Sequence, residues 1–285
     1  MAREPLDSEI LGSRGDRDDI LHRAMLALNG QRPQEALLCA EKVLKTDRRD
    51  GQASRIFGGA LLMLDRAADA IAPLENAARE LRNAETDTML AIALRKVGRG
   101  EDALSRLKRA IKRRPPYAAA FHELGYLLFL LRRDSEAIEA LHQGLEIAPM
   151  MPELSIQLGY VFLRQRNCPE AKRAFGRALE ISPDSADALS GMARAHQEIG
   201  ENEAAANYLR RHLRRRPDNV GAWINLGHCL LELGELEAGY DCFRTAARAD
   251  PASYGRTLNS LASAARGRFW LRPTAAERFL RRQKN

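Results

Sequence analysis

Apolar residues recur along most of the chain in short stretches that come in pairs. Phe121, Leu124 and Leu128 mark one stretch, and a second follows at Leu141 and Leu145. Apolar residues three or four positions apart lie on one face of an α-helix. The segment between the two stretches is short and polar, as in a turn. The pattern therefore predicts an all-α chain of amphipathic helices that are paired through tight turns.

The paired pattern repeats at a fixed interval of 34 residues. Proline ends the repeat at five equally spaced positions, which are Pro115, Pro149, Pro183, Pro217 and Pro251. Proline cannot continue a helix, and it disfavours helix in the residue before it. A period of this length is typical of a chain that stacks one supersecondary unit many times. We therefore expect a one-dimensional stack of helical hairpins rather than the two globular domains that length alone suggests.

Small residues recur inside the repeat as well. Gly125 and Ala137 are two of them, at the eighth and twentieth positions of their unit. Small side chains there let the two helices approach closely, and a leucine at either position is expected to overpack the unit by roughly 1–3 kcal/mol. The register gives seven units, of which the first two are the most degenerate. The units are 17–50, 51–83, 84–117, 118–151, 152–185, 186–219 and 220–253.

These positions make the chain resemble the tetratricopeptide repeat (TPR) family. The residues that carry the resemblance are Phe121, Leu124-Gly125, Ala137 and Pro149, with equivalents in the neighbouring units. The resemblance implies a right-handed α-α superhelical solenoid of about seven TPR hairpins plus a C-terminal capping helix. It also implies a concave groove that binds peptides or other proteins.

In such a solenoid the first helix of each unit lines the groove, which the resemblance implies for positions two, five, nine, twelve and thirteen. The middle of the groove is then aromatic and aliphatic, and arginines flank it. Such a surface suits a peptide with hydrophobic and some acidic side chains, because Tyr and Arg are enriched at binding hot spots. The alternative is that Tyr126 and Phe129 pack against the adjoining unit or the C-terminal tail. The candidate partner-binding residues are Arg55, Thr88, Ile92, Arg95, His122, Tyr126, Phe129, Ile156, Tyr160, Arg164, Arg194 and His228.

The positive charge of the chain is concentrated at its C-terminal end. The net charge is +7, and residues 254–285 hold eight Lys/Arg and one acidic residue. We expect an N-terminal extension (1–16), a seven-unit solenoid (17–253) and a basic cap or tail (254–285), in which residues 254–266 form a lone capping helix. The apolar groups of the tail either fold back on the last unit, dock on a partner or an anionic membrane surface, or stack with single-stranded nucleic acid. The candidate tail-docking residues are Phe269, Trp270, Phe279 and Leu280.

Motifs for catalysis or metal binding do not appear in the sequence. It lacks a phosphate-binding glycine loop, a His-Glu-x-x-His helix and paired cysteines at ligand spacing. The four cysteines, Cys39, Cys168, Cys229 and Cys242, are scattered and are expected to be reduced thiols. We expect no signal peptide and no membrane span, because the longest apolar run has only eight residues.

We therefore expect a cytoplasmic, non-catalytic scaffold that needs no cofactor or metal and binds a peptide or protein segment in its groove. The alternative function is an adaptor tethered to a membrane surface or a larger assembly through its basic aromatic tail. A stand-alone enzyme is the least favoured hypothesis, and nucleic acid is not the expected partner. Neither the identity of the partner nor the oligomeric state follows from the sequence.

Overall fold

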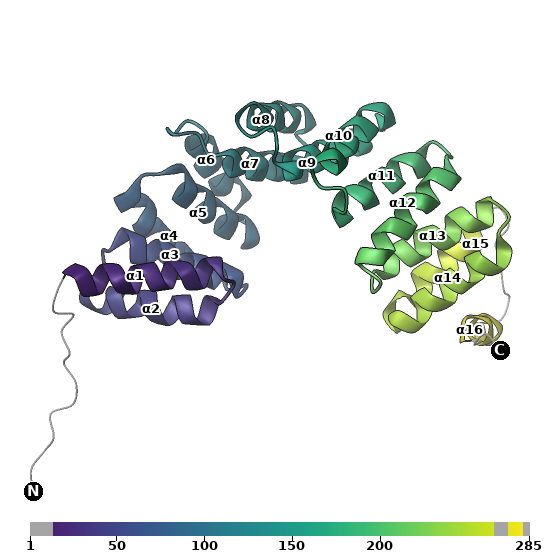
Figure 1. Cartoon of the computed structure of the whole chain (residues 1–285), viewed down its shortest axis with the longest axis horizontal. Helices are drawn as coiled ribbons and strands as arrows, with labels where there is room; N and C mark the ends of the chain where they lie inside the picture. Colours follow the sequence, from purple (N-terminus) through teal and green to yellow (C-terminus); the bar gives the residue numbers. More distant parts are fainter. Residues whose placement is uncertain (1–13, 265–272, 282–285) are drawn as a thin grey trace, which may run out of the picture. The chain divides into compact units, whose positions relative to one another are not determined.

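The computed structural model describes residues 14–264 and 273–281 (Figure 1). Within these ranges the regular structure consists of sixteen α-helices and one short 3-10 turn, without a strand. The described residues up to Ala148 form one compact unit, here called unit 1, and those from Pro149 onward form a second, here called unit 2. The prediction of an all-α chain built from paired helices is confirmed.

Unit 1 contains the first eight helices of the chain. They are α1 (Arg14–Asn29), α2 (Pro33–Thr46), α3 (Gly51–Met63), α4 (Ala67–Leu81), α5 (Ala84–Lys96), α6 (Gly100–Ala110), α7 (Ala118–Leu130) and α8 (Asp134–Ile147).

Unit 2 contains the other eight helices and the 3-10 turn. They are α9 (Pro152–Arg164), α10 (Cys168–Ile181), α11 (Ala186–Glu198), α12 (Asn202–Arg215), α13 (Val220–Glu232), α14 (Leu236–Ala249), η1 (Pro251–Ser253), α15 (Tyr254–Ser263) and α16 (Pro273–Arg281).

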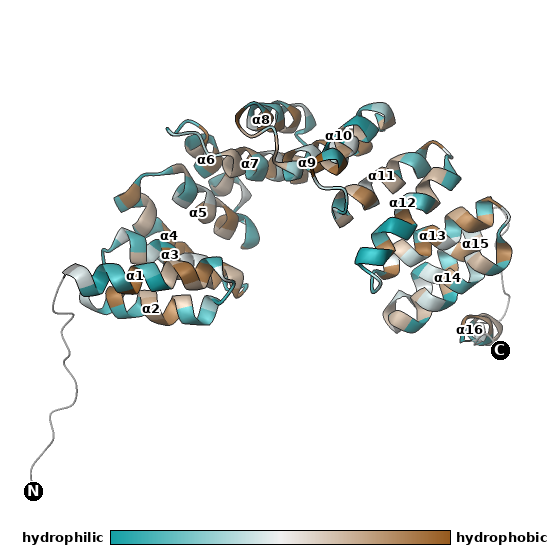
Figure 2. Ribbon diagram, viewed as in Figure 1, coloured by the Kyte–Doolittle hydropathy of each residue, from teal (hydrophilic) through white to brown (hydrophobic). Residues whose placement is uncertain are grey.

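The helices keep the period read from the sequence. From α5 to α13, each odd-numbered helix begins at the first residue of an expected unit, and α15 begins where an eighth unit would start. We call the odd-numbered member of each hairpin, from α1/α2 to α13/α14, its first helix and the even-numbered member its second helix. Within each unit, a second helix packs against its own first helix and against the first helix of the next hairpin. Figure 2 shows apolar and polar residues mixed along these helices, because only part of each helix faces its neighbours.

The turn inside each hairpin contains one residue in the left-handed backbone region. The N–H of the following residue reaches back into the first helix, for example from Arg99 to the carbonyl of Leu94 at 2.9 Å, which satisfies a carbonyl at the helix end. Glycine takes this conformation freely, whereas other residues adopt it at a steric cost of roughly 1–2 kcal/mol. The left-handed residues are Gln31, Asp65, Gly98, Arg132, Arg166, Gly200 and Gly234, with φ between 55° and 85°.

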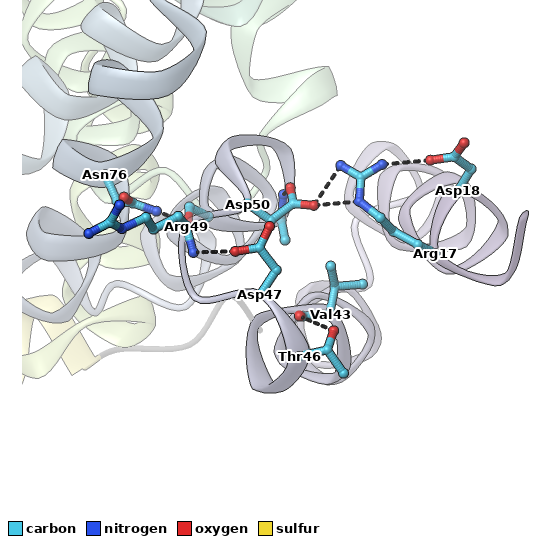
Figure 3. A network of polar contacts seen from close by, with 10 residues as sticks. Arg17, Asp18, Val43, Thr46, Asp47, Arg49, Asp50 and Asn76 are labelled. Atoms are coloured by element: carbon cyan, nitrogen blue, oxygen red, sulfur yellow. Dashed lines mark hydrogen bonds and ion pairs between the residues drawn. The ribbon is translucent and has the colours of Figure 1, made fainter. Parts of the chain in front are cut away.

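Several helices are preceded by an N-cap residue whose side chain accepts a hydrogen bond from a backbone N–H of the first turn. Figure 3 shows Asp50, which is the N-cap residue of α3 and also contacts Arg17 of α1. One carboxylate oxygen of Asp50 accepts a hydrogen bond from the backbone N–H of Ala53 at 2.8 Å. The other accepts a hydrogen bond from Nε of Arg17 at 2.6 Å. Asp50 is 4% exposed, so its carboxylate is largely removed from water, whereas the Arg17 side chain is still partly exposed. One side chain thus both starts α3 and holds α1 against it.

Close packing between hairpins depends on glycine at the helix crossings. Phe175 of α10 is completely buried, and its ring lies against Gly159 of α9 and Gly191 of α11. A Cβ atom added at Gly159 would lie 2.6 Å from a ring carbon, and one added at Gly191 would lie closer still. Both separations are shorter than van der Waals contact. The ring therefore fills space that exists only because both positions lack a side chain.

The end of the last hairpin is covered by α15 and α16. Leu280 of α16 is 1% exposed and belongs to the same apolar cluster as Phe243 of α14. The ring of Phe279 meets that of Tyr240 edge-on at 5.2 Å, and the guanidinium carbon of Arg244 lies 4.7 Å from the centre of the Phe279 ring. These contacts place α16 on α14, at the position that a further hairpin would otherwise occupy.

All four cysteines are free thiols, and three of them are buried. Burial raises the pKa of Cys242 to about 12. Burial also raises the pKa of the Cys229 thiol, and a hydrogen bond from the Gln197 amide to its Sγ at 3.1 Å opposes that rise without cancelling it. Cys39 of α2 is only half-buried. The pKa values of Cys229 and Cys242 are therefore shifted in the opposite direction from the lowered pKa that a reactive cysteine needs.

Replacement of Gly191 by alanine is expected to destabilise the chain by about 1–3 kcal/mol, because the new methyl group overlaps the ring of Phe175. Gly176→Ala in α10 is the matched control, since the nearest atom to its methyl group is 3.8 Å away. That control is expected to be neutral or to stabilise the helix by up to ~1 kcal/mol. The urea midpoints of both variants measure the difference. A Gly191→Ala midpoint at or above that of the unaltered chain would contradict the packing described above.

Iodoacetamide at pH 8 is expected to modify Cys39 and to leave Cys229 and Cys242 intact in the folded chain. The thiolate is the reactive form, and burial suppresses it at both inner positions. Peptide mass spectrometry of samples quenched over time measures each rate, and the urea-unfolded chain provides the control in which all sites react. Equal rates at Cys39 and Cys242 in the folded chain would show that Cys242 is not protected.

Candidate partner-binding face

The first helices of successive hairpins lie against one another throughout unit 1 and at the start of unit 2. In unit 1, α1 contacts α3, α3 contacts α5 and α5 contacts α7, and in unit 2, α9 contacts α11. Across the described residues, no two second helices contact each other to a similar extent. The side of a stack on which neighbours approach most closely is its inner side. We call the surface formed by the first helices of a unit its first-helix face.

Every predicted partner-binding residue lies on a first helix. Those in unit 1 are Arg55 on α3, Thr88, Ile92 and Arg95 on α5, and His122, Tyr126 and Phe129 on α7. Those in unit 2 are Ile156, Tyr160 and Arg164 on α9, Arg194 on α11 and His228 on α13. The structure thus divides the predicted set between the faces of two units.

Arg55 connects two first helices of unit 1 rather than standing at a rim. Its Nη1 lies 2.6 Å from Oε1 of Glu85 on α5, and its Nη2 lies 3.8 Å from the sulfur of Met25 on α1. The residue is only 8% exposed. A guanidinium that has lost most of its water and has found a carboxylate is part of the packing between hairpins.

Arg95 makes the equivalent connection one hairpin further along. Its Nη2 lies 3.4 Å from Oε2 of Glu123 on α7, and its guanidinium carbon lies 4.8 Å from the centre of the Tyr126 ring. A cation over an aromatic face is typically stabilised by about 0.5–2 kcal/mol, depending on exposure. All three side chains are half-buried. The charge of Arg95 is therefore already compensated by its own chain.

Sequence reasoning did not identify Glu85 and Glu123, which neutralise the two arginines. Glu85 occupies the second position of its unit, which the family resemblance assigns to the groove, so a search for opposite charges at groove positions of adjacent units would have found it. Glu123 occupies the sixth position, outside that set. Thr88 is 3% exposed, and its hydroxyl donates to the carbonyl of Ala84 at 2.7 Å. It therefore presents little surface to a partner.

In unit 2, Tyr160 and Ile156 of α9 form the apolar part of the face. The Tyr160 hydroxyl donates to the carbonyl of Asp187 on α11 at 3.2 Å, and its ring meets Phe175 edge-on at 5.2 Å. Burial raises the pKa of Tyr160, with a smaller contribution from the charge of Asp187. Both Tyr160 and Ile156 remain half-buried, so part of each ring or side chain is still open to solvent.

The remaining charged positions of this face are more open. Arg194 of α11 is exposed, and its Nε lies 3.9 Å from Glu198. His228 of α13 is half-buried, with Nε2 at 3.9 Å from Glu232. His122 of unit 1 lies at the same separation from Glu123. Of the predicted tail-docking residues, Phe279 and Leu280 contact α14 as described, whereas Phe269 and Trp270 fall outside the described residues.

Clusters that could hold a metal ion and helices that could span a membrane are both absent from the described residues. Among them, no cluster of three or more His, Cys, Asp or Glu side chains has the arrangement to hold a metal ion. No helix in the ranges that the structure covers combines the length and apolar character needed to cross a bilayer. Each first-helix face carries half-buried aromatic and aliphatic groups, such as Ile92 and Tyr126 in unit 1 and Ile156 and Tyr160 in unit 2.

Several solved structures share this fold at low sequence identity. PilF from Pseudomonas aeruginosa gives a TM-score of 0.61 at 19% identity, over 70% of this chain and 92% of that one. The Cut9–Hcn1 hetero-tetramer of the APC/C gives 0.73 at 14% identity, over 87% of this chain and 49% of the matched chain. The human IFIT1 dimer with PPP-AAAA gives 0.68 at 19% identity, over 86% and 62%. At these identities the likeness establishes the fold alone. No curated protein matches the sequence.

Sequence models of the tetratricopeptide repeat account for most of the chain. One matches residues 21–86, 88–152 and 190–254, and another matches residues 162–216. Repeats of this kind typically mediate protein–protein interactions and are generally non-catalytic. The period, the paired helices and these matches agree, and the chain belongs to the tetratricopeptide repeat family.

Proposed function

We propose that this chain is a non-catalytic scaffold that binds a peptide or protein segment on the first-helix face of its repeats. The observation that carries the proposal is a set of half-buried apolar side chains on successive first helices of one unit, such as Ile92 on α5 and Tyr126 on α7. Large side chains that are held by neighbours yet still partly exposed gain further burial when a partner covers them. They also lose little conformational freedom on binding, which favours affinity.

The charges of the face refine the chemistry of the expected partner. Arg55 and Arg95 already pair with Glu85 and Glu123, so an acidic partner would have to displace these carboxylates. Partly buried pairs of this kind connect neighbouring first helices. We therefore expect apolar and aromatic contacts to contribute most of the affinity in unit 1, with hydrogen bonding at the edges of the contact.

The structural neighbours are compatible with this proposal without specifying a partner. The Cut9–Hcn1 neighbour is an assembly of two different proteins, and the IFIT1 neighbour is a dimer with PPP-AAAA. The same fold thus accommodates more than one kind of ligand. A protein segment is favoured here because half-buried aromatic and aliphatic groups such as Tyr126 and Tyr160 lie on the first-helix faces. Tethering through the tail is less favoured, because Leu280 already has a partner in α14.

Photo-crosslinking at single positions tests where a partner binds. The photoreactive residue p-benzoylphenylalanine replaces Tyr126 in one variant and Tyr160 in another, and Leu38 in a control. Leu38 lies on the second helix α2 and is 60% exposed, so it reports non-specific contact. We expect a discrete protein adduct from positions 126 or 160 that is absent from position 38. The same adducts at all three positions would contradict the proposal.

Replacement of Tyr126 by alanine is then expected to weaken binding of the crosslinked partner by at least about 1 kcal/mol, which is roughly fivefold in Kd. Tyr126→Phe is the matched control, because it keeps the ring that Arg95 covers, and we expect it to change Kd by less than about twofold. Calorimetric titration of the purified partner into each variant measures the effect. Equal Kd values for the alanine variant and the unaltered chain would remove Tyr126 from the binding site.

A further inference from the structure

A hollow lined only by cationic side chains lies in unit 1, away from the first-helix face. It occupies about 330 Å³ at the C-terminal ends of α4 and α6, two second helices that Figure 1 labels. Its lining residues are Arg82, Arg109, Lys112, Arg113 and Arg114. The apolar groups that line the other hollows of this unit are absent from its wall.

The course of the backbone brings these residues together. Arg82 follows the last residue of α4 and adopts a left-handed conformation with φ of 49°. Lys112, Arg113 and Arg114 follow the end of α6, in the segment that leads to α7. Cations near helix C-termini are favourable because the last carbonyls carry partial negative charge. That effect explains one or two basic residues at each end, but it does not explain a shared hollow.

One buried carboxylate holds two of the arginines in position. Asp87 of α5 is 0% exposed, and both Arg109 and Arg113 donate to it. The distance from Nε of Arg113 to Oδ2 of Asp87 is 2.9 Å, and that from Nε of Arg109 to the same oxygen is 3.2 Å. These bonds fix the two side chains before any ligand arrives, which lowers the ordering cost of binding.

The hollow keeps a large excess of positive charge. Five lining cations against the single carboxylate of Asp87 leave a net charge of +4. The bonds found for Arg82 and Arg114 go to the backbone carbonyls of Arg79 and Arg113, at 3.3 and 3.4 Å, and these do not neutralise charge. Like charges gathered around one hollow repel each other, and a multiply charged anion removes that repulsion.

We propose that this hollow binds a phosphate group. Four of the five lining residues are arginines, whose planar guanidinium matches phosphate oxygens with paired hydrogen bonds. Five cations around one hollow suit an anion that carries more than one charge on a single group. The group belongs either to a free phosphate compound or to a phosphorylated side chain of a protein partner. In the second case, the hollow supplies a contact separate from the first-helix face.

Sodium pyrophosphate is the probe for a calorimetric titration of the full chain at low salt. The test variant is Lys112→Ala/Arg114→Ala, chosen because neither residue bonds to Asp87 and the tie between α5 and α6 is kept. The control is Arg214→Ala/Arg216→Ala, which removes the same charge at the end of α12 in unit 2. We expect saturable binding that the test variant weakens at least about tenfold and the control at most about twofold, because close cationic contacts act locally.

Equal losses in the two variants would overturn the proposal, since they would show attraction by bulk charge alone. Absence of saturable binding in the unaltered chain would overturn it as well. Circular dichroism and urea midpoints verify the fold, and Lys112→Ala alone replaces the double variant if that one unfolds.

The source of the phosphate is identified by comparing the binding of two peptides with that of pyrophosphate. The peptides are identical except at one position, which holds phosphoserine in one and glutamate in the other. Binding of the phosphoserine peptide that depends on Lys112 and Arg114, and is tighter than that of pyrophosphate, would support a phosphorylated partner. Binding of pyrophosphate alone would support a free phosphate compound. Equal binding of the two peptides through the hollow would show a site for any anion and would overturn the assignment to phosphate.

Discussion

Within each unit, the apolar face of a helical hairpin is covered by the next hairpin, and that mutual covering governs the rest of the structure. Phe175 is completely buried because α9 and α11 present glycine on either side of its ring. The same kind of crossing recurs where glycine meets a large residue of the partner helix. The further pairs are Gly58 with Leu74, Gly125 with Leu141 and Gly227 with Phe243. Steric fit at these crossings sets the short spacing between helices, and the polar contacts form within it.

Because of that spacing, side chains of the first-helix face bond to the neighbouring first helix, and some of them still keep part of their surface exposed. Adjacent first helices lie close enough for Arg55 to reach Glu85 and for the Tyr160 hydroxyl to reach a carbonyl of α11. These bonds engage the polar ends of both side chains. The ring of Tyr160 stays half-buried, whereas Arg55 is buried. A face of this kind is held in place before a partner arrives, so little ordering has to accompany binding.

Helices α15 and α16 cover apolar side chains of the last hairpin, α13/α14. Among the described residues, α15 and α16 follow α14 in place of another hairpin, and without them the apolar side of α14 would face water. Leu280 and Phe279 of α16 cover it, and Arg244 stacks on the ring of Phe279. Terminal elements with a polar outer side are what an array of repeats needs at its ends. Pro273 begins α16, where proline is tolerated because the first N–H of a helix has no partner within it.

The amino-acid sequence determined the period, the paired helices, the glycine and alanine positions at the crossings and the repeat family, because each depends on residues close together in the chain. It also placed the candidate binding residues on first helices. Only the tertiary structure decided which arginines are paired with a carboxylate. Glu85 pairs with an arginine 30 residues away, and Asp87 pairs with arginines 22 and 26 residues away. Contacts at such separations depend on how neighbouring hairpins stack. The neutralised arginines of the first-helix face and the concentrated charge beside α6 are both products of that stacking.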